Sequence, residues 1–344
     1  MLLHRNAVPE NSVIQLEASN ECVQNIRSAD ELQRFEGVAF SALGNIIAVA
    51  ASDTNAVFLF RRKPDGLFED TPYQRISGPT SRLNYPHDLA FTRSGEAELL
   101  AVAQRRGSIL VYEKNKCDEY YGIEPVFEIS GARTKLNFCD GVTFVGTNDD
   151  YLAACNVTNA SITFYRKDPG GLLGFKSKPV FQLTHPSLSN PDGLAFSRCG
   201  TWLAVANHGN HTVSVFKRRR LTFWGNLKYG RQPITVIKDP ELRYPHSVAF
   251  TGSNNLVVTN AGANYFSIYA PTKSRLKFRW SQSPMLRKIV GPDKLFRQIN
   301  AANKQEGGPK GVAIHEDYIA ICSPEHGVKI YRFREVSEPG GKAM

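Results

Sequence analysis

The sequence contains no long apolar stretch and few cysteines. No run approaches the ~18 apolar residues that a membrane-spanning helix requires, so we expect no transmembrane segment. The opening residues, MLLHRNAVPENS, lack the apolar core of a secretory signal, which favours a cytoplasmic location. The 6 cysteines among 344 residues form no CxxC pair, so we expect reduced thiols rather than a disulfide scaffold.

The sequence also lacks the short motifs of several large enzyme classes. It has no GxSxG elbow, no HExxH helix, no Walker loop and no dinucleotide fingerprint. No reaction class therefore follows from a local motif. The formal net charge of +10 permits an acidic partner such as nucleic acid, an anionic membrane or a negatively charged substrate, without choosing among them.

What the sequence does contain is a repeated unit, seen most clearly at Asn190–Phe216. In this segment, NPDGLAFSRCGTWLAVANHGNHTVSVF, three short apolar runs are bounded by Gly, Pro, Asn or Ser, which is typical of three antiparallel strands. The unit recurs six times, with starts 51 to 64 residues apart. Its first strand reads EGVAF at 36–40, HDLAF at 87–91, DGVTF at 140–144, DGLAF at 192–196, HSVAF at 246–250 and KGVAI at 310–314.

A fourth strand follows in five repeats, and the sixth repeat runs out of chain before it. Val13–Leu16, a strand-like segment near the N-terminus, is expected to supply this outer strand and close a ring. We therefore predict one all-β domain over residues 1–344, a six-bladed β-propeller of four-stranded antiparallel blades. Blade cores are expected near residues 36–77, 87–130, 140–184, 192–238, 246–290 and 310–334 plus 13–16.

One insertion interrupts the regular spacing, at Gly291–Pro309 between the fifth and sixth repeats. Its polar part, KLFRQINAANKQEGGP, is consistent with a short helix or an ordered lid, and equally with a long loop.

Strands alternate direction within a blade, so the turn before strand one and the link after strand two share one face, around the central axis. This geometry selects two residues per blade. The first set is ionisable in every blade and comprises Glu36, His87, Asp140, Asp192, His246 and Lys310. The second set comprises Ala51, Gln104, Asn156, Asn207, Asn260 and Ser323.

We expect the two sets to line a polar axial pocket that binds a small molecule. In this pocket Gln104, Asn260 and Ser323 are candidate ligand-binding residues. The alternative for each residue singly is that it hydrogen-bonds a neighbouring turn, as Asp and Asn often do at strand starts.

The repeats resemble those of six-bladed propellers of the NHL-repeat, gluconolactonase and strictosidine-synthase-like groups. The segments PDGLAFS, LAVAN and TVSVF are also similar to the YVTN-type repeats of lactonase-like propellers. The resemblance covers nearly the whole chain and implies the fold. Propellers of these groups include hydrolases, lactonases and interaction modules, so the fold does not decide the function.

Gluconolactonase-like propellers hold a divalent ion at the axis, and Glu36-Gly37 and Asp192-Gly193 match their pattern. This chain departs from the pattern elsewhere. Val-Ala-Phe follows Glu36-Gly37 where the family has Pro-x-Trp, and an Asn-Gly expected in a middle blade is absent. His87, His246 and Lys310 add positive character to the same ring.

The residue types of the two sets suggest a chemistry for the pocket. Asp140 and Asp192, with Asn156 and Asn207 beside them, form an oxygen-rich arc that suits one divalent cation such as Ca²⁺ or Mg²⁺. Together with the resemblance, this makes Glu36, Asp140, Asn156, Asp192 and Asn207 the candidate metal ligands.

Three residues of the first set are candidates for catalysis. His87 or His246 is expected to act as general base on a water, and Lys310 to stabilise developing negative charge. The sequence thus favours a small-molecule-binding propeller, either a metal-assisted hydrolase or lactonase-type enzyme or a binding protein without catalysis.

A different class of function is suggested by the opposite face. Where the third strand ends, the chain is repeatedly basic, and the segments 217–231 and 273–280 interleave Lys and Arg with Phe, Trp and Tyr. Such a surface fits a noncatalytic scaffold that binds an acidic protein, a nucleic acid or an anionic membrane. The alternative is a solvated rim whose aromatic residues fold back over the blade ends.

Overall fold

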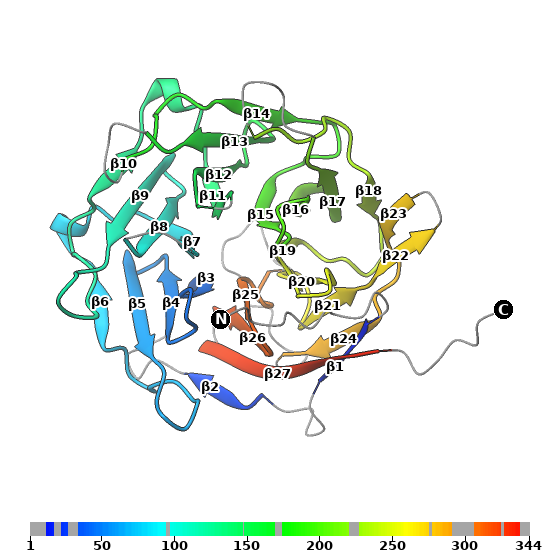
Figure 1. Ribbon diagram of the computed structural model, residues 1–344, viewed down its shortest axis with the longest axis horizontal. Helices are drawn as coiled ribbons and strands as arrows, with labels where there is room; N and C mark the ends of the chain where they lie inside the picture. Colours follow the sequence, from blue (N-terminus) through cyan, green and yellow to red (C-terminus); the bar gives the residue numbers. More distant parts are fainter. Residues whose placement is uncertain are drawn as a thin grey trace, which may run out of the picture.

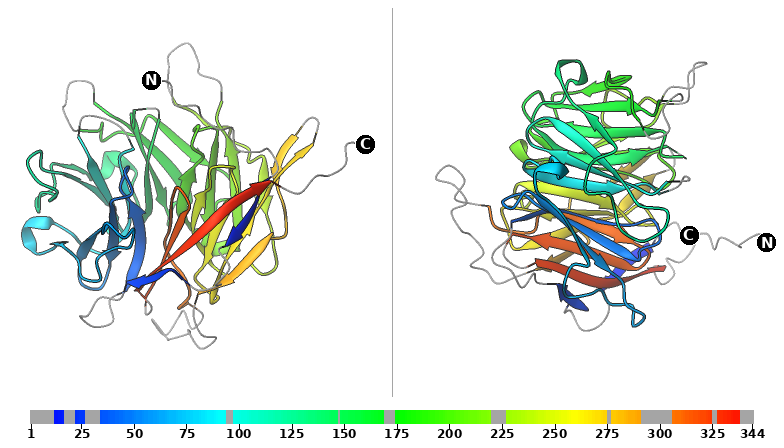
Figure 2. Two further views of the ribbon diagram at one scale, coloured as in Figure 1. Left: turned by 60° about the horizontal axis from the view of Figure 1, so that its bottom comes forward. Right: turned by 90° about the vertical axis from the view of Figure 1, so that its left-hand side faces the viewer.

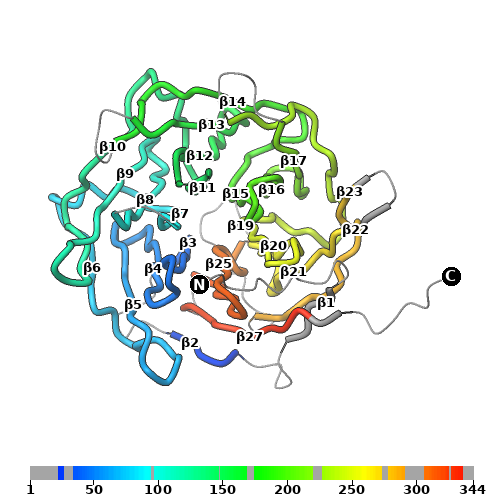
Figure 3. Tube along the Cα trace, viewed as in Figure 1, coloured from blue at the N-terminus to red at the C-terminus, as the bar shows by residue number. Residues whose placement is uncertain are grey.

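Six antiparallel sheets surround a central axis in the computed structural model, and the chain passes from blade to blade in sequence order (Figure 1). The tube in Figure 3 follows this single circuit from blue to red. The sequence prediction of a six-bladed β-propeller is confirmed. The structure describes residues 12–16, 22–26, 34–93, 97–146, 148–168, 174–219, 227–274, 277–290, 306–324 and 327–337. Within these ranges, no helix has the length and apolar character needed to span a membrane.

Each blade has its first strand innermost. Blade 1 comprises β3 (Phe35–Phe40), β4 (Ile46–Ala51), β5 (Ala56–Arg61) and β6 (Gln74–Ile76). Blade 2 comprises β7 (Pro86–Phe91), β8 (Leu99–Gln104), β9 (Ser108–Glu113) and β10 (Phe127–Ile129). Blade 3 comprises β11 (Cys139–Val145), β12 (Tyr151–Asn156), β13 (Ser161–Arg166) and β14 (Phe181–Thr184). Blade 4 comprises β15 (Pro191–Phe196), β16 (Trp202–Asn207), β17 (Thr212–Lys217) and β18 (Thr235–Ile237). Blade 5 comprises β19 (Pro245–Phe250), β20 (Leu256–Asn260), β21 (Tyr265–Tyr269) and β24 (Leu286–Ile289). A hairpin of β22 (Pro271–Ser274) and β23 (Lys277–Trp280) extends blade 5.

Blade 6 is completed by the N-terminal part of the chain. After β25 (Val312–His315) and β26 (Tyr318–Ser323), the long strand β27 (Gly327–Ser337) has two N-terminal strands along its outer edge (Figure 2). β1 (Ser12–Leu16), which contains the strand predicted to close the ring, pairs with the last residues of β27. β2 (Gln24–Ile26), which the sequence analysis did not identify, pairs with its beginning.

β2 takes the place that the fourth strand has in the other blades, as its contacts with the next blade show. The Gln24 amide donates to the Phe68 carbonyl oxygen at 2.7 Å and accepts from the Phe68 N–H at 2.8 Å. Gln74 in β6 makes the same pair of bonds to Tyr121, at 2.6 and 2.9 Å. The seam between the two ends of the chain is therefore held like a continuous blade interface.

The hydrophobic core is divided into six clusters, one between each pair of neighbouring blades. Alternate residues of a second strand point to opposite neighbours. In β4, Ile46 and Ala48 pack against blade 2, whereas Ile47 and Val49 pack against blade 6, and all four are fully buried. Burial of both faces explains why the second strands read as continuous apolar runs instead of alternating ones.

The basic and aromatic segments at the ends of the third strands have a structural role where they are described. Backbone bridges join Arg62 to Phe68 and Arg218 to Tyr229, and both aromatic side chains are at most 2% exposed. Phe278 of the blade 5 hairpin stacks on Trp202, with ring centroids 5.0 Å apart. These aromatic residues fold back over the blade ends. Residues 220–226 and 275–276, which belong to the proposed binding surface, and residues 291–305 of the insertion lie outside the described part of the chain.

Five of the six first strands begin with an irregularity that aims one side chain at the axis. A register shift interrupts the pairing with the second strand near Glu36, His87, Asp140, Asp192 and His246. A β-bulge inserts an extra residue and redirects the side chain at that point. The fold thereby turns a polar residue inward at the start of an otherwise apolar strand.

Glycine follows the inward-facing residue in four blades because the neighbouring first strand lies too close for a side chain. A Cβ at Gly37 would lie 2.7 Å from the His87 carbonyl oxygen, and one at Gly193 would lie 2.6 Å from that of His246. Real Cβ atoms do not approach backbone so closely, so the glycines permit the contact between adjacent strands at the axis.

We predict that Gly193→Ala destabilises the protein, because the new methyl group overlaps the backbone of β19. Overpacking of this kind costs about 1–3 kcal/mol in the free energy of unfolding, which urea denaturation measures. Gly230→Ala is the matched control, since its Cβ would come no closer than 3.5 Å to the nearest neighbouring atom, the Lys217 carbonyl oxygen. Equal stability of the two variants would contradict the prediction.

Candidate functional site

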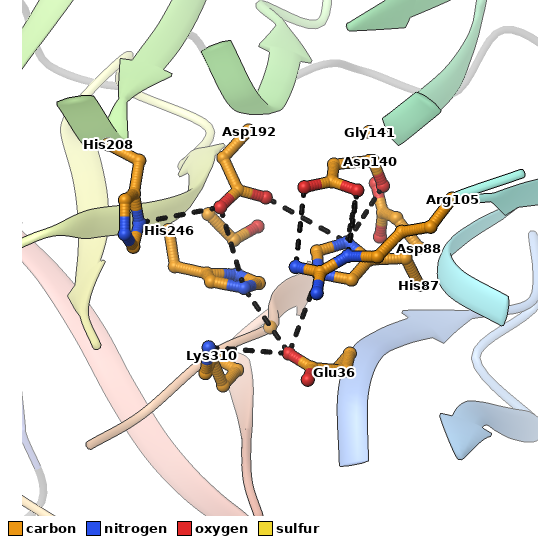
Figure 4. A network of polar contacts seen from close by, with 12 residues as sticks. Glu36, His87, Asp88, Arg105, Asp140, Gly141, Asp192, His208, His246 and Lys310 are labelled. Carbon is orange, nitrogen blue, oxygen red and sulfur yellow. Dashed lines mark hydrogen bonds and ion pairs between the residues drawn. The ribbon is translucent and has the colours of Figure 1, made fainter. Parts of the chain in front are cut away.

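The six ionisable residues predicted from the strand starts meet at the axis of the ring (Figure 4). They come from six different blades, and none is more than 5% exposed to solvent. The structure therefore brings the whole first set together as one buried cluster, which comprises Glu36, His87, Asp140, Asp192, His246 and Lys310.

Glu36 is the anion at the centre of this cluster. Its Oε2 atom lies 3.5 Å from His87 Nε2, 3.3 Å from His246 Nε2 and 3.5 Å from Lys310 Nζ. Its other oxygen forms an ion pair with the guanidinium of Arg34. Burial alone raises the pKa of a carboxyl, but Lys310, His246 and Arg34 together hold the pKa of Glu36 well below its usual value. Glu36 is accordingly ionised.

The two axial histidines are neutral. His87 donates from Nδ1 to the Asp140 carbonyl oxygen at 3.0 Å, and its Nε2 accepts from Arg105 Nη2 at 2.7 Å, because a guanidinium only donates. Burial and the Arg105 charge hold the pKa of His87 well below its usual value. Burial and Lys310 lower the pKa of His246 to about 3.

The two axial aspartates are shifted in the opposite direction. Burial raises the pKa of Asp140 to about 6, although Arg105 Nε donates to its Oδ1 at 3.0 Å. Burial and the neighbouring Asp140 raise the pKa of Asp192 well above its usual value. The described basic side chains closest to the Asp192 carboxyl are all imidazoles, at 3.5 Å for His208, 3.6 Å for His246 and 3.8 Å for His87. A protonated Asp192 carboxyl can donate a hydrogen bond into the site.

Two cavities adjoin the cluster, and both Asp140 and Asp192 line each of them. The smaller, of about 10 Å³, has room for about one water molecule. The larger, of about 270 Å³, is a polar chamber that we call the axial cavity. Its ionisable lining residues are Arg34, Arg105, Asp140, Asp192, His208, Glu306 and Lys310.

Several of these residues were missed by the sequence analysis. Arg105 and His208 directly follow Gln104 and Asn207, so the second set was chosen one residue too early to reach the axial cavity. A regular backbone bond places them: the N–H of His208 donates to the Asn190 carbonyl at 3.1 Å, and Arg105 makes the same bond to its own blade. Glu306 comes from the end of the insertion, where no repeat pattern could identify it.

The turns before the first strands, whose carbonyls accept these backbone bonds, are strained. Tyr85, Phe138, Asn190 and Tyr244, each two residues before a first-set residue, have positive φ angles of 56°, 52°, 44° and 48°. Bulky residues rarely adopt the left-handed region, and such strain tends to collect at functional sites. Phe138 lines the axial cavity, with the Arg105 guanidinium 5.2 Å from its ring centroid.

The second set of predicted residues stays within its own blades. Asn156 donates to Thr163 Oγ1 at 3.0 Å and accepts from the Asn137 N–H at 3.1 Å, and Asn207 donates to Ser214 Oγ at 3.0 Å. Asn260 and Gln104 make corresponding bonds, whereas the buried Ser323 hydroxyl has no partner among the described residues. None of these five residues lines either of the two cavities. Their contacts hold the turns between strands two and three.

The residues at the axis do not fit the oxygen-rich set expected for Ca²⁺ or Mg²⁺. Asn156 Oδ1 already accepts from the Asn137 N–H, neither Asn156 nor Asn207 lines either of the two cavities, and Asp140 is bonded to Arg105. Two groups of three side chains offer ligand atoms close together: Glu36, His87 and His246, and His87, Asp140 and Asp192. Lys310 lies on the Glu36 oxygen, however, and Arg105 already bonds both His87 and Asp140. Positive side chains thus stand where a metal ion would have to bind.

The fold and the site together define a six-bladed propeller with a polar axial cavity. No protein-family model matches the chain, and no curated protein matches it in sequence. Solved structures match its fold. The β-propeller domain of Cps50 (Swd1) from Myceliophteria thermophila has a TM-score of 0.58 and 12% identity, over 91% of this chain and 99% of that one.

Two further solved structures are of different kinds. The WD40 repeats of RRP9 match with a TM-score of 0.58 and 11% identity, over 94% of this chain and 100% of that one. A protein assigned as a 6-phosphogluconolactonase from Bacteroides uniformis matches with a TM-score of 0.57 and 13% identity, over 87% and 82%. At such identities the likeness concerns the fold alone.

We predict that Asp192→Asn stabilises the protein at alkaline pH and not at acid pH. A carboxyl with a raised pKa favours the folded state while protonated, and this contribution is lost as the pH rises above the unfolded pKa of ~3.9. Asn resembles the protonated carboxyl and cannot ionise. The melting temperature of the variant should therefore exceed that of the wild type at pH 8 and equal it near pH 4.

Asp53→Asn is the control for this experiment. Asp53 is an exposed residue of the link after the second strand of blade 1, and it has no partner among the described residues. Its melting temperature should follow that of the wild type at both pH values. A stabilisation by Asp192→Asn that does not depend on pH would show that ionisation of Asp192 is not its cause.

Proposed function

We propose that the axial cavity binds a small, anionic, oxygen-rich molecule and that the protein hydrolyses an ester or lactone of this kind. The observation that supports this proposal is the position of two half-buried guanidinium groups at the wall of a cavity next to carboxyl groups with raised pKa values. The alternative is that the same site binds such a molecule without catalysing a reaction.

The guanidinium groups supply the anion recognition. Arg105 uses Nε and Nη2 on Asp140 and His87, and Arg34 uses Nε on Glu36. No described residue accepts from the remaining N–H groups of either side chain, and 24% and 19% of their side-chain surfaces are exposed. Guanidinium N–H groups bind carboxylates and phosphates in a fixed forked geometry. Lys310 adds a third positive charge at the cavity wall.

The carboxyl groups supply proton transfer. Asp140, with a pKa of about 6, and Asp192, whose pKa is higher than usual, can donate a proton near neutral pH. A protonated carboxyl beside positively charged donors suits the carbonyl or leaving oxygen of an ester. The neutral imidazoles of His87 and His246 are fixed by their neighbours, which favours positioning over the catalytic roles expected from the sequence.

The structural neighbours are consistent with this proposal and with a noncatalytic scaffold alike. One neighbour is assigned as a 6-phosphogluconolactonase and two are propellers of the WD40 type or of Cps50 (Swd1). Because one fold hosts many functions, the proposal depends on the cavity and not on these likenesses.

We predict that the wild-type protein binds at least one of succinate, gluconate and inorganic phosphate with a Kd below ~1 mM, measured by calorimetry. Arg105→Gln should weaken this binding about 10- to 100-fold, because a hydrogen bond to a charged group contributes ~1.5–3 kcal/mol. Arg133→Gln is the control, since Arg133 is exposed and has no described contact. If none of the three anions binds, the proposed function is wrong.

We also predict that divalent ions have little effect on stability. A site that binds Ca²⁺ with a Kd one-hundredth of its concentration would stabilise the fold by ~2.7 kcal/mol. With the axial positions taken by Lys310 and Arg105, we expect 1 mM Ca²⁺, Mg²⁺ or a chelator to shift the melting temperature by less than about 1 °C. A shift of several degrees would restore the metal-assisted mechanism expected from the sequence.

A further inference from the structure

His208 differs from the axial histidines because it lines the axial cavity, which neither His87 nor His246 does. Its Nδ1 atom is buried, has no hydrogen-bond partner among the described residues and lies 3.5 Å from Asp192 Oδ2. The side chain lines the axial cavity and keeps 17% of its surface exposed. A short 3₁₀ turn, His208–Asn210, holds it between β16 and β17.

The other ring nitrogen is held by a carboxylate. His208 Nε2 lies 2.9 Å from Glu306 Oε1, and the second Glu306 oxygen accepts from Lys310 Nζ at 3.0 Å. Although burial raises the pKa of Glu306, its contacts with His208 and Lys310 hold it far below the usual value, so Glu306 is ionised and can only accept. His208 therefore carries its proton on Nε2, and Nδ1 presents a lone pair.

From this arrangement we infer that His208 is the general base of the axial cavity and that Glu306 positions it. The inference rests on the proposed function, since it concerns the hydrolysis of an anionic ester or lactone in the same cavity. An imidazole whose other ring nitrogen is held by a carboxylate is the arrangement that many hydrolases use on unrelated folds.

The step balances with water as the only co-reactant. His208 Nδ1 takes a proton from water while the water oxygen bonds to the carbonyl carbon, and the carbonyl π electrons move onto its oxygen. The N–H groups of Arg105 and the ammonium of Lys310 stabilise that negative charge. When the bond from carbon to the leaving oxygen breaks, the carbonyl re-forms, and the proton on Nδ1 passes to the leaving oxygen.

Other titratable and aromatic groups surround the His208 ring. Asp192 faces Nδ1, the Tyr244 ring lies 4.9 Å from the imidazole centroid, and the His246 ring lies 6.4 Å away. Glu306 stabilises the protonated imidazole that forms when water is deprotonated. His211 is a further titratable neighbour, and Lys310 binds the same Glu306 carboxylate as His208 does.

The test uses mono(4-nitrophenyl) succinate, an anionic ester whose hydrolysis releases a coloured phenolate. His208→Gln should lower kcat about 100-fold or more and leave KM within about threefold, because general base catalysis contributes ~10²–10⁴-fold. His211→Gln is the matched control: His211 lies in the same link, with its ring centroid 4.4 Å from that of Tyr244, yet it lines neither cavity, so kcat should stay within about twofold.

Glu306 is tested as a positioning residue by the pH profile. Glu306→Gln should lower kcat and move the acid limb of the profile to lower pH, because the imidazolium loses its carboxylate partner. Glu306→Asp should restore part of both effects. A purely structural salt bridge would change stability without moving the acid limb.

A measurement on the unaltered protein guards against variants that fail to fold. In the wild type, ¹⁵N NMR should show His208 with an unprotonated Nδ1 and a protonated Nε2. The reverse tautomer would overturn the inference, whatever the variants do.

The outcomes separate this inference from the proposed function. If the wild type hydrolyses the ester and His208→Gln retains its rate within threefold, the base assignment is wrong and the proposed function stands. If the wild type binds succinate without hydrolysing the ester, both the base and the hydrolytic part of the proposed function are wrong. If it neither binds nor hydrolyses, the proposed function is wrong as well.

Discussion

The close approach of the first strands at the axis is the constraint on which the rest of the structure depends. Neighbouring strands come so near that a Cβ at Gly141 would lie 2.3 Å from the Asp192 carbonyl oxygen. This contact closes the ring, and it also forces the inward-facing side chains of six blades into one small volume. Because that volume is buried, each charge in it must be neutralised, paired or abolished by a change in protonation.

The cluster meets this requirement in three ways. Glu36 keeps its charge because Lys310 and Arg34 pair with it, His87 and His246 stay neutral, and the two aspartates have raised pKa values. Each of these groups influences the pKa values of its neighbours, so one substitution in the ring changes the pKa values of several others. The axial cluster therefore behaves as one electrostatic unit and not as six independent residues.

The axial cavity extends this unit toward solvent. Arg105 connects the two, since it bonds His87 and Asp140 in the cluster and still has N–H groups at the cavity wall. Glu306 adds a contribution from the only long insertion, which joins His208 to Lys310 across the cavity. Cations of the chain itself thus occupy the positions where the resemblance to gluconolactonase-like propellers implied a metal ion.

The sequence by itself determined the propeller, the number of blades and the six inward-facing residues, because repeat spacing and strand alternation are local properties that packing does not change. It did not determine which strand fills the sixth blade: β2 is three residues long, and only its register and the Gln24 bonds to Phe68 identify it. Nor could it place Arg105, His208 and Glu306 in one cavity. The closure of the turn between strands two and three decides whether an asparagine or the residue after it faces the axis. Glu306 reaches His208 only when blades 4 and 6 meet across the ring. These are contacts between distant segments, so tertiary structure alone decided them.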